Sequence, residues 1–183
     1  VPSGYLALCT KNLAAPTIAL PGDHFNAVTY TGDGGTSKAI TGVGFAPDVV
    51  WSKQRTSTNW HQIYDKVRGA THALFPNEAY VEYTYTDGLE SFDSDGYTVG
   101  DSANATPNVL NQTYVGWCWK ANGAGSSITS VGTIDSTVSA NTDTKFSVVK
   151  YVGNGTAGAT VAHGLGVKPQ MIFIKDRDTA DSW

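Results

Sequence analysis

Charge is what this sequence lacks most. Asp, Glu, Lys and Arg make up 15% of its 183 residues, whereas an average globular domain holds about 25%. The twelve basic residues are scattered and the formal net charge is −4, so the chain has no cluster of cations to meet a phosphate backbone. We therefore do not expect nucleic acid to be a partner.

Long apolar runs and helix-forming runs are also missing. No stretch approaches the roughly 20 apolar residues of a membrane span, so membrane insertion is not expected. Segments rich in Ala, Leu, Glu and Lys are almost absent, while Gly, Thr, Ser, Asn and Tyr are abundant. That mixture favours short strands joined by tight turns, and it predicts an all-β protein.

Cysteine is scarce as well. Cys9 and Cys118 are the two cysteines, and neither lies in a CxxC or His spacing that would indicate a metal site. The sequence leaves two alternatives open, a Cys9–Cys118 disulfide or two free thiols.

An internal repeat organises the chain. Residues 25–60 align with residues 146–183, with an offset that grows from 121 to 123. Ten positions are identical in this alignment: Phe25/Phe146, Val28/Val149, Tyr30/Tyr151, Gly32/Gly153, Gly34/Gly155, Gly44/Gly166, Pro47/Pro169, Lys53/Lys175, Arg55/Arg177 and Trp60/Trp183. A fixed period of this kind indicates tandem copies of one module.

The repeat predicts four regions. Residues 1–22 have no counterpart before Phe146 and are interpreted as the end of an upstream domain and a linker. Residues 23–122 form one complete module, and 123–144 are expected to be a polar linker. Residues 145–183 are the start of a second copy, which stops at the counterpart of Trp60. We expect this chain to be an excerpt of a larger protein.

Strand signals recur through the complete copy. Alternating or apolar runs separated by Gly-containing turns predict strands at 25–30, 38–41, 48–53, 80–86, 96–100 and 114–120. Residues 59–68 could hold a single helical turn. Seven or eight short strands in about 100 residues are typical of a sandwich, so the predicted fold is an antiparallel β-sandwich of jelly-roll or lectin-like type.

One motif imitates a cofactor site. GNGTAG at Gly153–Gly158 matches G-x-G-x-x-G, but a dinucleotide site needs a helix after the third glycine. The sequence TVAHGLGVKP that follows cannot form one, so we interpret GNGTAG as a hairpin turn. The chain also lacks G-x-S-x-G and E-x-D-x-x-E, and its four histidines have no characteristic partner spacing. We predict that the protein is not an enzyme.

A calcium loop is the remaining cofactor hypothesis. Asp93 and Asp95 lie one residue apart in FDSDG, as in calcium-binding loops, but the twelfth position is Asn104 where a full loop has Glu. The alternative is a turn whose Asp side chains bond the local backbone. No other cofactor is expected.

Aromatic residues divide into two groups. Trp51, Trp117 and Trp119 lie on predicted strands and are expected in the core. Trp60, His61 and Tyr64 follow the polar turn TSTN, and we expect them to be exposed, where sugar rings could stack on them. The alternative is a rim packed against the neighbouring copy. Lys53 and Arg55, repeated as Lys175 and Arg177, suggest ion pairing with local Asp residues or with the next module.

A family resemblance rests on four segments: ITGVGFAPDVVWSKQR, YDKVRGATHALFPN, TDGLESFDSDGYTVG and TYVGWCWKANG. They resemble a module repeated in large tail-fibre-like structural proteins of marine bacteriophages. PSGYLALCTKNLAAPTIALP at the start looks like the junction that follows a SPRY-type, concanavalin-like domain in those proteins. The resemblance implies lectin-like sandwiches in series at the virion surface or outside the cell. It carries over no catalytic or ligand-binding residue.

Three functions follow as hypotheses. The first is a non-catalytic virion structural protein, such as a tail-fibre or appendage segment that attaches to host-surface glycans. The second is a carbohydrate-binding accessory module of a secreted bacterial protein. The third is a capsid decoration or baseplate component with no ligand. Expected partners are other virion proteins, further copies of the chain (a trimer, by comparison with other phage fibres) and a host-surface glycan.

Overall fold

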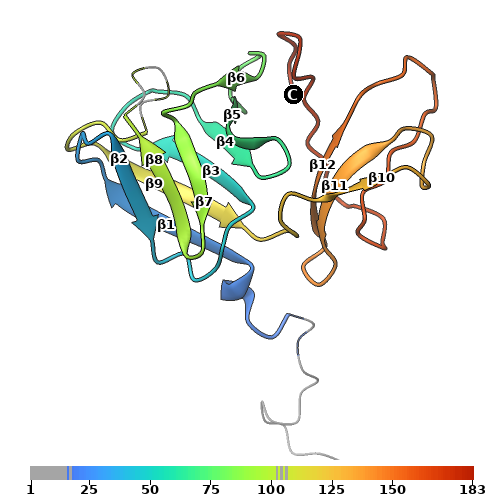
Figure 1. Ribbon diagram of the computed structural model, residues 1–183, viewed down its shortest axis with the longest axis horizontal. Helices are drawn as coiled ribbons and strands as arrows, with labels where there is room; N and C mark the ends of the chain where they lie inside the picture. Colours follow the sequence, from blue (N-terminus) through green and yellow to red (C-terminus); the bar gives the residue numbers. More distant parts are fainter. Residues whose placement is uncertain (1–15, 17, 102, 104, 106) are drawn as a thin grey trace, which may run out of the picture.

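The computed structural model describes residues 16, 18–101, 103, 105 and 107–183, and it shows two all-β units (Figure 1). One short 3₁₀ helix, η2 (Pro21–Asp23), precedes the strands. The strands in chain order are β1 (Phe25–Thr31), β2 (Ser37–Thr41), β3 (Val49–Gln54), β4 (Gln62–Asp65), β5 (Gly69–Leu74), β6 (Tyr83–Thr84), β7 (Leu89–Asp93), β8 (Gly96–Gly100), β9 (Thr113–Trp119), β10 (Ser126–Ile128), β11 (Ser136–Asn141) and β12 (Phe146–Tyr151). The described residues include no helix that is long and apolar enough to cross a membrane.

The first unit is a sandwich of two antiparallel sheets, which confirms the predicted fold. One sheet has six strands in the order β1-β9-β3-β4-β5-β6, and the other has three in the order β2-β8-β7. The strands that begin and end this unit are neighbours, since Phe25 of β1 lies opposite Trp119 of β9. The chain therefore enters and leaves the sandwich at the same end.

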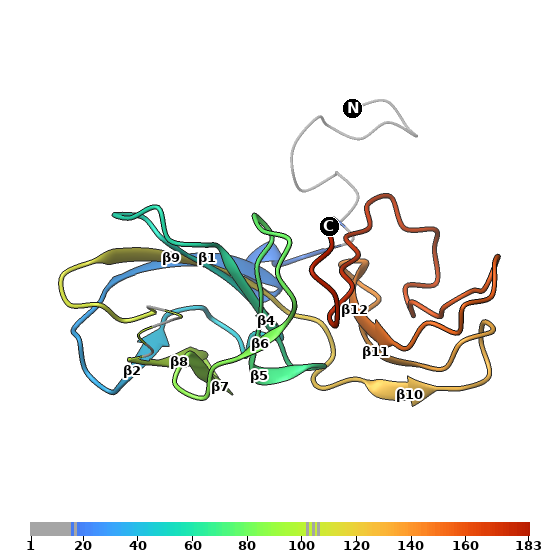
Figure 2. The same ribbon diagram turned by 90° about the horizontal axis from the view of Figure 1, so that it is seen from above.

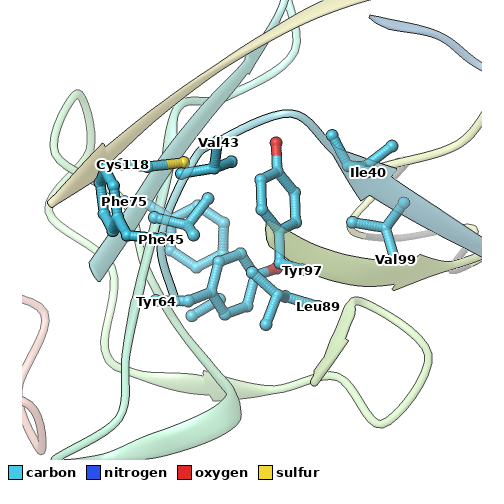
Figure 3. Close-up of a cluster of buried hydrophobic side chains, with 11 residues drawn as sticks. Ile40, Val43, Phe45, Tyr64, Phe75, Leu89, Tyr97, Val99 and Cys118 are labelled. Atoms are coloured by element: carbon cyan, nitrogen blue, oxygen red, sulfur yellow. The ribbon is translucent and has the colours of Figure 1, made fainter. Parts of the chain in front are cut away.

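The core lies between the two sheets (Figure 3). Val50, Tyr64 and Cys118 reach it from the six-stranded sheet, and Leu89 and Tyr97 from the three-stranded sheet. Tyr97 extends across the sandwich toward β9, because a Cβ atom built at Gly116 would lie 2.1 Å from the Tyr97 hydroxyl oxygen. A glycine at position 116 is thus what gives this tyrosine room.

The second unit is a three-stranded antiparallel sheet in the order β10-β11-β12. β12 is the counterpart of β1, and the chain after it folds back along the sheet, with Ala162 and Leu165 buried. The C-terminal stretch then runs between β12 and the first sandwich, as the dark red trace shows in two perpendicular views (Figures 1 and 2).

Three expected segments differ from the structure. Residues 59–68, where a helical turn was expected, contain β4 instead, because Gln62–Asp65 pairs with β3 on one side and β5 on the other. Within 80–86 only Tyr83–Thr84 forms a strand. Residues 123–144, expected to be a linker, contain β10 and β11, where Val138 and Ser139 are buried.

Candidate functional site: the junction of the two copies

The first turn of each copy folds in the same way. The Asp33 carboxylate accepts a hydrogen bond from the Gly35 backbone N–H, and the Asn154 side-chain oxygen accepts one from the Thr156 N–H. The glycine between them, Gly34 or Gly155, has a φ of 70° in both copies, a left-handed conformation that glycine adopts readily. GNGTAG is therefore a turn, as its sequence context predicted.

A shared aromatic side chain joins the two units. The Trp119 ring lies 5.1 Å from the Phe25 ring and 6.1 Å from the Phe146 ring, between centroids. These two phenylalanines occupy the same position in the two copies. Trp119, at the end of the first copy, thus contacts the first strand of both copies, and aromatic pairs of this kind contribute about 1 kcal/mol each beyond their buried area.

Hydrogen bonds also form where the two units meet. The Ser139 hydroxyl accepts a bond from the Asn122 N–H and donates one to the Gly123 carbonyl, both at 2.8 Å. The Lys150 ammonium donates to the Val67 carbonyl at 3.2 Å. The Asn122–Ser139 and Lys150–Val67 bonds therefore add directional polar contacts between the units, which favour one relative orientation of the units.

A second contact between the copies is an ion-pair network at Glu82. Arg68 of the first copy and Arg177 of the second both donate to the Glu82 carboxylate. Arg68 also pairs with Asp65, and all three side chains of the first copy are nearly buried. Burial alone would raise the pKa of Glu82, but hydrogen bonds from Arg177 and Arg68 outweigh it and hold that pKa below its usual value. Arg177 thus meets an ionised carboxylate.

Trp183 makes the third contact of the junction. Its indole N–H donates to the Phe75 carbonyl at 2.8 Å. Four aromatic rings contact the Phe75 ring edge to face: Trp60, Tyr80, Tyr83 and Tyr85. Trp60 and Trp183, which are equivalent in the repeat, therefore both contact Phe75.

The three candidate ligand-binding residues do not form one exposed group. Trp60 is 38% exposed, but its ring packs against Phe75 and Tyr80, and the hollow beside it holds only about 10 Å³, roughly one water molecule. His61 is half-buried and bonds Trp51. Tyr64 is 2% exposed, so the expectation that it is exposed was wrong. The contacts described for the three side chains are with residues of the first copy, and the alternative of a rim packed against the neighbouring copy stays a prediction.

The contact between His61 and Trp51 sets the state of the imidazole. The Trp51 indole N–H donates to Nδ1 of His61 at 3.0 Å, which requires that nitrogen to be unprotonated. Burial, together with the nearby charge of Lys53, lowers the pKa of His61 below its ordinary value. His61 is therefore neutral at pH 7 and structural in its contacts.

Asp93 and Asp95, the weak calcium candidates, accept hydrogen bonds from other residues of the first copy. Asp93 accepts hydrogen bonds from the Ser91 and Thr98 hydroxyls, and Asp95 accepts bonds from the Gly42 and Gly44 N–H groups. Within the described residues no three His, Cys, Asp or Glu side chains gather as a metal site. Asp93 thus bonds neighbouring side chains, and Asp95 holds backbone N–H groups 53 and 51 residues away in sequence, so these bonds are not to the local backbone as the turn alternative expected. Cys118 is a free, fully buried thiol, while Cys9 lies outside the described residues.

Comparison with known proteins gives a family and no activity. Residues 20–183 match a family described as Domain of unknown function (DUF7483). The chain belongs to this family. No curated protein and no solved structure matches it. The match to the DUF7483 family runs through both units, so the junction at Trp119 and Glu82 lies inside the family's domain.

The DUF7483 domain also has a depression that the sequence did not reveal. It measures about 550 Å³ and lies beside β12, where its lining includes Thr133, Asp135, Tyr151, Asn154 and Arg177. The Tyr151 side chain is 41% exposed. Its counterpart, Tyr30, stacks on Tyr114 at 4.8 Å in the first sandwich, so the repeat alone would place Tyr151 in a core as well. No sequence signal distinguishes the two tyrosines.

Proposed function

We propose that this chain is a non-catalytic structural segment of a virion appendage, in which repeated sandwiches are held one against the next. The observation that carries the proposal is the shared Trp119 contact, in which equivalent residues of two copies, Phe25 and Phe146, pack on one ring. A contact that uses the repeat in this way is what a serial array needs to keep its copies in a fixed orientation. The resemblance of four sequence segments to a phage tail-fibre module supports the virion assignment.

The acidic side chains of the first copy support a structural role. Asp48 pairs with Lys66 at 2.9 Å, and Asp65 and Glu82 pair with Arg68. A general acid or base needs a pKa near the working pH and access to substrate, whereas these carboxylates are buried in ion pairs. Their charges are used to hold loops and the two copies together.

The junction can be tested in solution. The double variant Phe146→Ala with Arg177→Ala removes the aromatic stack and the ion pair while leaving the first core untouched. We expect small-angle X-ray scattering to show a larger radius of gyration and a broader distance distribution than for the parent chain. Phe173→Ala removes an equally large but exposed ring and is the control. Scattering that is identical for all three proteins would overturn the fixed-array proposal.

The virion assignment needs a separate test. Mass spectrometry of particles purified from a culture of the source should detect peptides of this chain, and capsid and tail genes should flank its gene. We expect the chain at the particle surface beside other virion proteins, as copies that associate with one another (a trimer in the hypothesis above). Flanking genes for secreted bacterial enzymes would instead support the accessory-module hypothesis.

A second candidate function, glycan binding, is favoured by the depression beside β12. Ligand sites commonly measure about 300–1,000 Å³, and this one combines an exposed Tyr151 ring with the carboxylate of Asp135 and the amide of Asn154. Sugars stack on such rings while their hydroxyls bond acids and amides. Host-surface glycan attachment would therefore use Tyr151 and not the rim at Trp60.

A glycan array separates the two candidates. If the depression binds sugar, Tyr151→Ala and Asn154→Ala should abolish the array signal, while Trp60→Ala should leave it unchanged. A well-folded chain that binds no glycan would leave the structural role alone. A signal lost with Trp60→Ala but kept with Tyr151→Ala would assign the ligand to the rim instead.

A further inference from the structure

Four consecutive apolar residues of the second copy face solvent. Met171, Ile172, Phe173 and Ile174 are between 60% and 75% exposed, and no strand includes them. Soluble proteins seldom leave such a continuous apolar segment open, and where they do it commonly marks an interaction site. The segment is therefore a candidate interaction site.

The first copy shows which partner such a segment takes. By the repeat, Met171–Ile174 corresponds to Val49–Ser52 of β3, a strand that pairs with β9 on one edge and β4 on the other. There the counterpart of Ile172, Val50, is fully buried. The same type of sequence is thus an interior strand in one copy and an unpaired segment in the other.

A second edge lies near the exposed segment. β12, the counterpart of β1, pairs with β11 on one edge, and no strand of the described chain pairs with its other edge. Both views show the C-terminal stretch running along that side of β12, between it and the first sandwich (Figures 1 and 2). In the first copy, β9 is the strand that lies between β1 and β3.

We propose that the free edge of β12 and the exposed segment Met171–Ile174, which together we call the slot, accept a β-strand with the sequence character of β9. Addition of a strand to an open edge gives affinity through main-chain hydrogen bonds and specificity through alternate side chains. The inference rests on the repeat and holds whether or not the protein belongs to a virion. It competes with glycan stacking on Tyr151, because Tyr30 pairs with Tyr114 of β9 in the first copy and an added strand would cover Tyr151 in the same way.

The first copy also fixes the register of the incoming strand. Trp119 lies between Phe25 and Val49, and Trp117 lies between Ala27 and Trp51. In the slot, a residue at the Trp119 position would therefore lie between Phe146 and Met171. A residue at the Trp117 position would lie between Val148 and Phe173, where it covers the exposed ring.

Both parts of the slot are attached to the first sandwich. Arg177 is bound to Glu82 and Trp183 to Phe75, which anchors the chain just beyond the apolar segment. Phe146 of β12 stacks on Trp119. These contacts restrict the motion of both parts, which reduces the entropy lost when a strand binds.

The chain itself supplies the strand for a test in cis. Because Trp183 corresponds to Trp60, a copy of residues 61–121 can be attached after Trp183. We expect amide exchange at residues 171–175 to slow about 100-fold, and binding of an apolar dye to fall. The control carries Val115→Pro and Trp117→Pro in the attached copy, which removes the ladder. Unchanged exchange at 171–175 in a folded extended chain would overturn the proposal.

A test in trans covers the case in which the extended chain does not fold. A peptide with the sequence of residues 113–120, with Ser at the Cys118 position, is titrated into the parent chain and into an Ile172→Asp variant. Binding to the parent with protection at 146–151 and 171–176, and loss of binding in the variant, would support the slot. No protection at saturating peptide would refute it. A dimer of the parent chain, paired through Met171–Ile174, would assign the slot to a second copy and would also refute it.

Discussion

Lys53 and Lys175, which occupy the same position in the two copies, make the same pair of hydrogen bonds. Each ammonium group donates to the carbonyl oxygens one and four residues further along the chain, Gln54 and Ser57 in the first copy and Asp176 and Thr179 in the second. The first lysine lies next to the last residue of β3, inside a sheet, whereas the second follows a segment with no strand partner in the described chain. The turn after this lysine is therefore formed by local contacts and does not depend on the sheet.

Replacing either lysine should loosen its own turn. We expect Lys53→Met and Lys175→Met to speed amide exchange at residues 57–59 and 179–181 respectively, because each loses two bonds to turn carbonyls. Lys53→Met should also cost about 1 kcal/mol of unfolding free energy, since its turn supports a folded sheet. Hydrogen–deuterium exchange followed by mass spectrometry measures both turns. A change in exchange at 57–59 caused by Lys175→Met would contradict the claim that each turn depends only on its own lysine.

Gly116 and Tyr97 should be strongly coupled. A Cβ at position 116 would overlap the Tyr97 hydroxyl, so Gly116→Ala is expected to destabilise the sandwich by about 3 kcal/mol. That hydroxyl is buried and has no hydrogen-bond partner in the described part of the chain. Tyr97→Phe should therefore leave stability unchanged or raise it by about 1 kcal/mol.

The double variant provides the check. Gly116→Ala with Tyr97→Phe should recover part of the loss, because the nearest remaining ring atom lies 3.1 Å from the added Cβ. Urea titrations of the four proteins complete the cycle. Strictly additive effects would show that the clash is not with the hydroxyl.

The ion pairs of Glu82 should make stability depend on acid pH. The folded pKa of Glu82 lies below its ordinary value, so the carboxylate stabilises the fold above about pH 4.5 and loses this effect as pH falls through the folded pKa. Glu82→Gln should cost about 2 kcal/mol at pH 7, and the difference from the parent should shrink below pH 4. Thermal melts from pH 7 to pH 3 measure this difference. The control is Glu78→Gln, at a half-buried acid that bonds the Asn77 side chain and belongs to none of the ion pairs described above.

Cys118 should be unreactive until the protein unfolds. Burial raises the pKa of its thiol to about 12, so almost no thiolate exists at pH 8 and reagents cannot reach it. In a Cys9→Ser background, we expect Ellman's reagent to detect no thiol in the native protein and one in 6 M guanidinium chloride. Rapid reaction of the native protein would show that β9 opens readily.

How far the sequence predicts the fold depends on how local the signal is. Gly96–Gly100 was predicted as a strand and forms β8 with the same bounds. The prediction succeeds because the alternating side chains and the glycines at both ends, which indicate the strand, all lie within these five residues. β5 was missed, since Gly69–Leu74 reads as an irregular stretch and becomes a strand only through pairing with β4.

The candidate site was harder to predict for the same reason. Tyr64 follows a polar turn and looks exposed, but its hydroxyl donates to Gln62, whose amide in turn donates to the Ala105 carbonyl. Burial of this polar pair depends on a contact 43 residues away in sequence. The partner of Arg177, Glu82, likewise comes from a distant loop. The repeat predicted that Arg177 forms an ion pair with a local Asp or with the next module, but only the fold shows that its partner is Glu82 of the first copy.

The pairing of Phe25 with Trp119 also determines how the sandwich responds to force. The two ends of this unit leave from neighbouring points on adjacent antiparallel strands, and β1 is an edge strand. Tension along the polypeptide therefore loads the ladder between β1 and β9 one residue pair at a time, as a zipper is opened, and does not shear all pairs together. In the proposed serial array, such units would yield at low force and lengthen by unfolding in steps, and the array would then absorb strain as a tether.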